Sequence, residues 1–144
     1  MIPIKAGATL DVKDGATTYK LKYITVADEF EQYGKIEQEH ARIRDEIMQR
    51  ARAACPGADD AVVEATYSKL REEDSRTQGH KYIRVNDMYI DTFLCGWDGD
   101  GLPPFPADGR PSRCFRAYDK NAMVGLIIEA LPELLGFALD EVKN

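Results

Sequence analysis

Residues 25–57, TVADEFEQYGKIEQEHARIRDEIMQRARAACPG, indicate the fold more clearly than any other stretch of the chain. Thr25 is suited to cap a helix, with Asp28 three residues later as an acidic variant of the capping box. Cys55-Pro56-Gly57 is a helix stop. Between these signals, apolar side chains recur every three or four residues, apart from the interval at His40, as one helix face requires: Val26, Phe30, Tyr33, Ile36, Ile43, Ile47, Ala51 and Ala54. The stretch predicts one long amphipathic helix.

The residues before this helix are typical of a β-hairpin. Ala8–Val12 is followed by the turn signal Lys13-Asp14-Gly15-Ala16, and Thr17–Thr25 then alternates between apolar or aromatic residues and lysines. An isolated hairpin is only marginally stable in water, so it must pack on another element. We expect an N-terminal hairpin segment over residues 1–25.

Further helices are predicted after residue 58. One runs from Asp59 or Asp60 to Glu73, and the polar residues 74–79 are expected to form a loop. Tyr82–Cys95 suits either a helix or a strand, and its spacing favours a helix. Residues 96–113 are rich in glycine, proline and aspartate, which predicts irregular structure.

A last helical region begins near Asp119, is interrupted at Leu131-Pro132 and resumes over residues 133–142. The predicted class is therefore α+β, mainly α. A small hairpin segment (1–25) precedes a helical domain of about four to five helices (26–144), and the two together make a single compact unit.

Composition restricts the class of function. The net charge of -6 opposes binding to nucleic acid or to anionic lipid. The most apolar stretch, Met123–Leu139, is too short and too interrupted to span a membrane. Met1–Lys5 lacks the features of a secretory signal, which predicts a cytoplasmic protein.

No combination of residues predicts an enzyme, a cofactor site or a metal site. Asp98-Gly99-Asp100-Gly101 resembles the start of a calcium loop, but Leu102, Pro103 and Gly109 stand where that loop needs an oxygen ligand, a glycine and a glutamate. Neither of the two histidines lies in a zinc motif, and the three cysteines form no CxxC pair.

A basic and aromatic cluster, Arg110, Arg113, Phe115, Arg116 and Tyr118, is the one feature suited to nucleic acid. Three arginines in an acidic chain favour salt bridges or a protein contact instead. A further hypothesis is a small enzyme or nucleic-acid-modifying protein that uses this cluster.

The C-terminal third has an uncommon order of parts. Phe93-Leu94 leads to Gly96-Trp97, then to an acidic glycine turn at residues 98–101, a Pro-Phe pair and a final apolar region. This order, and the YKLKYITVAD stretch at residues 19–28, resembles the tail assembly chaperones of long-tailed bacteriophages and prophages. The resemblance loosely covers the first and last 50 or so residues. The matching positions are Gly96, Trp97, Asp100, Gly101, Pro104, Phe105, Lys143 and Asn144.

The resemblance implies a chaperone that binds the tape-measure protein and tail-tube subunits in the bacterial host cytoplasm without a cofactor. A homo-oligomer is compatible with this expectation. Met123, Leu126, Ile127, Leu131, Leu134, Leu135 and Phe137 are the candidate protein-binding residues, although they equally suit the domain's own core. Gly96, Trp97, Asp100, Gly101, Pro104 and Phe105 are expected to anchor the loop. The alternative function is a virion structural protein, such as a head–tail connector or a tail-tube-associated component.

Overall fold

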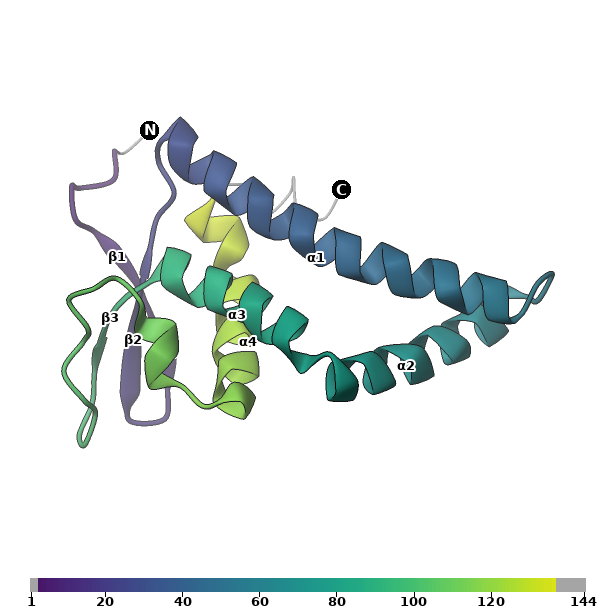
Figure 1. The fold of residues 1–144 in the computed structure, drawn as a ribbon. Coiled ribbons are helices and arrows are strands. Elements are labelled where there is room, and N and C mark those ends of the chain that lie inside the picture. Colours follow the sequence, from purple (N-terminus) through teal and green to yellow (C-terminus); the bar gives the residue numbers. More distant parts are fainter. Residues whose placement is uncertain (1–2, 137–144) are drawn as a thin grey trace. The chain divides into compact units, whose positions relative to one another are not determined.

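The computed structural model describes residues 3–136, which form a three-stranded antiparallel sheet and four α-helices (Figure 1). The elements follow in this order: β1 (Thr9–Asp14), β2 (Thr17–Lys22), α1 (Ala27–Ala54), α2 (Asp60–Thr77), α3 (Gly79–Phe93), β3 (Leu94–Asp98), the 3₁₀ helix η1 (Pro111–Cys114) and α4 (Ala117–Leu134). The predicted class, α+β and mainly α, is confirmed. In residues 3–136 no helix has the length and apolar character needed to cross a membrane.

The chain divides into two compact units. The sheet unit comprises the residues up to Tyr33 and those from Asn86 onward, and the helical unit comprises Gly34–Val85. Both α1 and α3 contribute residues to each unit. The units are thus interleaved along the sequence, whereas the expected boundary lies at residue 25.

The sheet places β2 between β1 and β3. Leu21 pairs with Leu10 on one side and with Leu94 on the other, and Tyr19 pairs with Val12 and Trp97. Lys20 pairs with Gly96, so Cys95 is the extra residue of a β-bulge. The expectation of helix for 94–95 and of irregular structure for 96–98 was therefore wrong. These residues gain a hydrogen-bonding partner that lies far away in the sequence.

The core of the sheet unit lies between the sheet, the C-terminal part of α3 and α4. Ile24 N–H donates to the carbonyl of Leu134 at 2.9 Å, which fixes the end of α4 beside the segment between β2 and α1. The rings of Tyr33 and Phe93 meet edge to face, with centroids 6.1 Å apart. The buried apolar side chains of this unit are Leu21, Ile24, Tyr89, Ile90, Phe93, Leu94, Met123, Val124, Ile127, Leu131, Leu134 and Leu135.

Two predicted helix boundaries were wrong. Residues 74–77 continue α2 instead of forming a loop, because Asp74 is buried and has its own polar partners. Pro132 lies inside the last turn of α4 and does not interrupt it. The helix ends two residues later, where Gly136 takes the left-handed conformation (φ 80°) common after a helix. The predicted helix over 137–142 lies outside the described residues.

In the helical unit, the second part of α1 and α2 run antiparallel (Figure 1), and Ile36, Ile43, Ile47 and Ala51 are the buried positions of α1. These four belong to the predicted apolar series. At the start of α1, the N–H of Thr25 donates to the carboxylate of Glu29 (3.4 Å), so Glu29 takes the role expected of Asp28.

A buried carboxylate, Asp74, joins the elements of the helical unit. It accepts hydrogen bonds from the Tyr82 hydroxyl (2.8 Å) and the Lys81 ammonium (3.2 Å), and the Arg50 guanidinium lies 3.9 Å away. Burial alone raises the pKa of Asp74, but the bonds from Tyr82 and Lys81 outweigh it and hold that pKa below its usual value. The guanidinium of Arg71 lies over the Tyr82 ring, 5.2 Å from its centroid.

Asp74→Asn is expected to destabilise the protein by about 1.5–3 kcal/mol, because hydrogen bonds to a charged, buried acceptor are weakened or lost. Urea denaturation followed by far-UV circular dichroism measures the change. Asp45→Asn is the matched control, since Asp45 is exposed and its pair with Arg44 contributes little. Equal midpoints for the two variants would contradict the role of Asp74.

Stability should also fall as the pH rises from about 10 to about 12. Burial, and then the hydrogen bond to Asp74, raise the pKa of Tyr82 from 10.0 to about 12, with Arg71 opposing them. In that range the unfolded chain has lost the Tyr82 proton and the folded chain retains it, so rising pH favours unfolding. Tyr82→Phe should show a shallower decline in denaturation midpoint over this range than the wild type. An equally steep decline in the variant would rule out the contribution of Tyr82.

Candidate protein-binding site

The predicted protein-binding residues of α4 lie mainly in the core of the sheet unit. Met123, Ile127, Leu131, Leu134 and Leu135 are buried. Leu126 is half-buried, and Phe137 lies outside the described residues. A partner can therefore reach Leu126 directly, while contact with the other five needs the core to open and stays a prediction.

The loop after β3 is held by the side chain of Trp97. Its indole N–H donates to the carbonyl of Pro103 at 2.8 Å, and its ring meets the Phe105 ring edge to face with centroids 4.8 Å apart. The hydrogen bond satisfies the polar end of the indole while the ring packs. The Trp97 side chain thus contacts two later residues of the same loop, Pro103 and Phe105.

The other predicted loop residues contribute differently. Gly96 leaves room for the Lys20 side chain, because a Cβ there would lie 3.3 Å from Lys20 Cδ. Gly101 has φ 76°, a conformation that favours glycine. Asp100 and Pro104 are exposed.

Sequence reasoning missed the second anchor of this loop. The carboxylate of Asp91 on α3 accepts from both the N–H and the hydroxyl of Ser112, each at 2.9 Å, and Ser112 is buried. Phe115 then packs against Trp97 (5.9 Å between centroids) and against Tyr19 of β2 (6.4 Å). No local pattern marks these partners, because they come from three separate parts of the chain.

The arginines of the basic cluster mostly pair with aspartates. Arg113 lies 3.7 Å from Asp108, and Arg116 lies 3.4 Å from Asp119. These exposed pairs are worth little to stability, but they neutralise much of the charge that a phosphate backbone would need.

Histidine, cysteine and acidic side chains within residues 3–136 are the remaining candidates for metal binding or thiol chemistry. No group of three or more histidine, cysteine, aspartate or glutamate residues there could hold a metal ion. Cys55, Cys95 and Cys114 are free thiols, and burial raises the pKa of Cys95, which makes its thiolate less available.

A groove of about 530 Å³ lies between β1 and α4, on the surface of the sheet unit. Its apolar side chains are only half-buried, so the domain leaves them partly uncovered, and exposed charged residues stand around them. We call it the β1–α4 groove; its lining residues are Leu10, Asp11, Val12, Lys13, Leu126, Glu129, Ala130, Pro132 and Glu133.

A second hollow of about 170 Å³ adjoins this groove and shares Leu126 with it. Asp14 and Asp119 also line it, together with Tyr19. Burial, and then these two carboxylates, raise the pKa of Tyr19. The groove residue Glu133 accepts a hydrogen bond from the Tyr23 hydroxyl at 3.4 Å, and burial, followed by the charge of Glu133, raises the pKa of Tyr23. The carboxylates of Asp14, Asp119 and Glu133 place negative charge along this surface.

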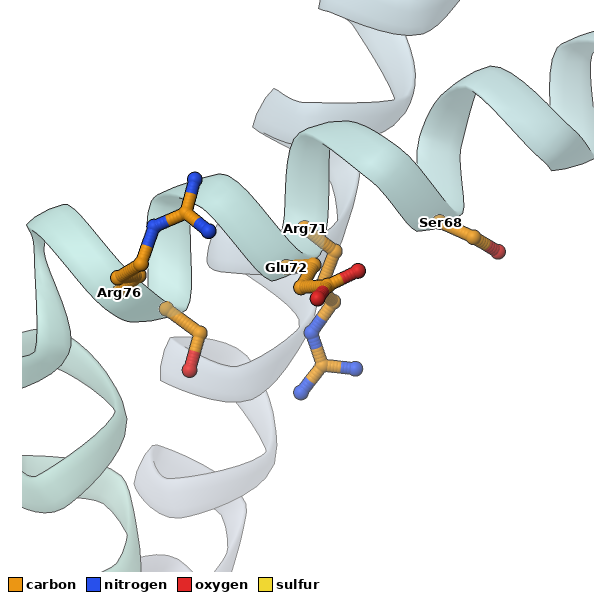
Figure 2. A pocket seen from close by; sticks show the side chains of 5 residues that line it. Ser68, Arg71, Glu72 and Arg76 are labelled. Carbon is orange, nitrogen blue, oxygen red and sulfur yellow. The ribbon is translucent and has the colours of Figure 1, made fainter.

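A further hollow of about 540 Å³ lies along α2 in the helical unit (Figure 2). It is lined by Ser68, Arg71, Glu72, Ser75 and Arg76, all of them exposed. Figure 2 shows the Arg71 and Arg76 side chains extending away from each other instead of converging on one point. An anion would therefore meet no converging pair of guanidinium groups there. The β1–α4 groove is the better candidate site.

Comparison of the chain with protein families, with curated proteins and with solved structures gives no match.

Phe105→Ala is expected to shift the fluorescence emission of the native protein to longer wavelength, because Trp97 is the single tryptophan and loses its edge contact. Loss of the aromatic pair should also cost about 0.5–1.5 kcal/mol of stability beyond the lost burial. Pro104→Ala, at the exposed neighbouring position, should change neither property. Unchanged emission in Phe105→Ala would show that the ring does not hold the loop.

Proposed function

We propose that this chain is a tail assembly chaperone of a long-tailed bacteriophage or prophage. It binds the tape-measure protein and tail-tube subunits in the cytoplasm of the bacterial host, and it acts without a cofactor. The proposal joins the sequence resemblance carried by Gly96, Trp97 and the Pro104-Phe105 pair with a surface suited to holding another polypeptide.

The β1–α4 groove is the observation that carries the protein-binding part of this proposal. A chaperone must offer apolar contact to an aggregation-prone chain and still remain dissolved itself. Half-buried Leu10, Val12 and Leu126 supply the apolar contact, and the exposed carboxylates of Glu129 and Glu133 keep the rim hydrated. The net charge of -6 serves the same purpose over the whole chain.

The groove also modifies the expectation for α4. The buried side of α4, which includes Met123, Ile127 and Leu131, stabilises the sheet unit. The side of α4 with Leu126 and Ala130 lines the groove. The proposal therefore places the first contact with a partner on the groove side of the helix.

A second candidate function is a virion structural protein. The position of β1 at the edge of the sheet favours it, because an edge strand can also join copies of one chain permanently. Mass spectrometry of purified particles separates the two functions, since a chaperone is absent from the finished virion and a structural component is present.

Co-expression with the tape-measure protein encoded beside it tests the chaperone proposal. The wild-type chain should keep the tape-measure protein in the soluble fraction and co-purify with it. Leu126→Ser/Ala130→Ser should reduce the recovered complex about tenfold, because apolar contact in the groove is lost. Val62→Ser/Ala65→Ser is the matched control on exposed positions of α2, and it should behave as the wild type does.

Failure of the wild type to solubilise or bind the tape-measure protein would reject the chaperone function. A complex that forms equally well with the groove variant would instead retain the function and reject the groove as its site. Circular dichroism spectra identify any variant that has lost its fold.

A further inference from the structure

The outer edge of β1 borders the β1–α4 groove. In the order β1-β2-β3, only one side of β1 is paired, and no strand within residues 3–136 covers the other. Four consecutive residues, Leu10 to Lys13, line the groove. Because neighbouring side chains of a strand point to opposite faces, a hollow that touches all four lies along the edge of the strand, where its backbone groups are.

Opposite this edge, α4 provides a floor that matches an extended chain. Leu126, Ala130 and Pro132 are half-buried and face the groove together with Leu10 and Val12. Every second side chain of a strand added beside β1 would point to this floor, and the others would point to water. The groove thus offers backbone hydrogen bonds along one wall and apolar contact along its base, the two requirements of strand addition.

The charge of the groove selects the kind of segment that it can hold. Asp11, Glu129 and Glu133 oppose a single cation, Lys13. Neither glutamate forms an ion pair with a described residue, and the adjoining hollow adds Asp14 and Asp119, of which Asp119 pairs with Arg116. A positively charged segment gains Coulomb attraction there, and an acidic one is repelled.

We propose that the β1–α4 groove binds an extended segment of a partner protein, in which apolar residues alternate with polar ones and lysine or arginine residues supply a net positive charge. The segment adds to the sheet as a fourth strand beside β1, over Leu126, Ala130 and Pro132. This inference rests on the proposed protein-binding function and names the chemistry of the partner. A second copy of the chain is disfavoured as the occupant, because its own β1 carries Asp11 and Asp14 against the single cation Lys13 and would bring a net negative charge to an acidic rim.

Selection from a displayed library of random 12-residue peptides tests the proposal with the full-length chain as target. The enriched peptides should share an alternating apolar pattern and a positive net charge. A synthetic copy of one of them should bind less tightly as the salt concentration rises. Methylation of alternate backbone nitrogens on its β1-facing edge should weaken binding about tenfold or more, because N–H donors to the strand are removed.

Variants of the groove locate the binding site. Glu129→Lys/Glu133→Lys should weaken binding of the selected peptide about tenfold or more, and Glu129→Gln/Glu133→Gln should weaken it less. Glu64→Lys/Glu73→Lys changes the net charge equally on exposed positions of α2 and should leave binding unchanged. The neutral pair keeps the test valid if charge reversal unfolds the chain.

The inference would be overturned if no peptide is enriched, if the enriched peptides are acidic or patternless, or if both groove variants leave binding unaltered. Light scattering that shows a dimer dissociated by the groove variants would also overturn it, since a second copy would then occupy the edge. Capture of the tape-measure protein is measured separately. If the tape-measure protein is captured but no peptide is selected, the proposed function stands without this inference. If peptides are selected but the tape-measure protein is not captured, the tape-measure protein is rejected as the partner.

Discussion

The pairing of β2 with β3 is the constraint on which the sheet unit depends. It joins Leu21, which is fully buried, to Leu94, and it brings Cys95 to Lys20 across 75 residues of sequence. Closing so long a loop costs conformational entropy, which the burial of the core must offset. Because α3 runs directly into β3, this pairing also fixes the C-terminal part of α3 under the sheet, and Trp97 then anchors the loop that leads to α4.

Elements with local signals were predictable from the sequence. The helix over residues 27–54 follows from spacing that repeats within one segment, and the hairpin follows from alternation on both sides of a turn. The strand over 94–98 was not predictable in the same way, because its partner strand is remote and its residues include a glycine and a bulge. The continuation of α2 through Asp74 was missed for a related reason. A charged residue usually indicates a position exposed to solvent, but Asp74 is buried with three cationic or hydroxyl partners.

The candidate site was only partly predictable. The sequence shows that α4 is rich in apolar residues, but cores and binding surfaces have similar compositions. The sequence therefore left open whether the apolar residues of α4 form the core or bind a partner. The structure separates the two sides of the helix: Ile127 is fully buried, whereas Leu126, the next residue before it, lines the groove. The groove itself is formed by β1 and α4, which come from opposite ends of the chain. No local sequence pattern indicates that two such distant segments lie side by side. The pairing of Trp97 with Phe105 was foreseeable because both lie in one short loop, while Phe115 and Ser112 were not.

The segment between β3 and α4 is attached at both ends, and this determines where the chain tolerates inserted residues. Trp97 secures its beginning and the bonds between Ser112 and Asp91 secure its end. Asp108 and Gly109 lie between these two anchors and are exposed. Lengthening a surface loop raises its closure entropy only slowly. The tip at Asp108-Gly109 is therefore a permissive position for inserting an epitope or a fluorophore-binding tag, at a distance in sequence from β1 and from the groove side of α4.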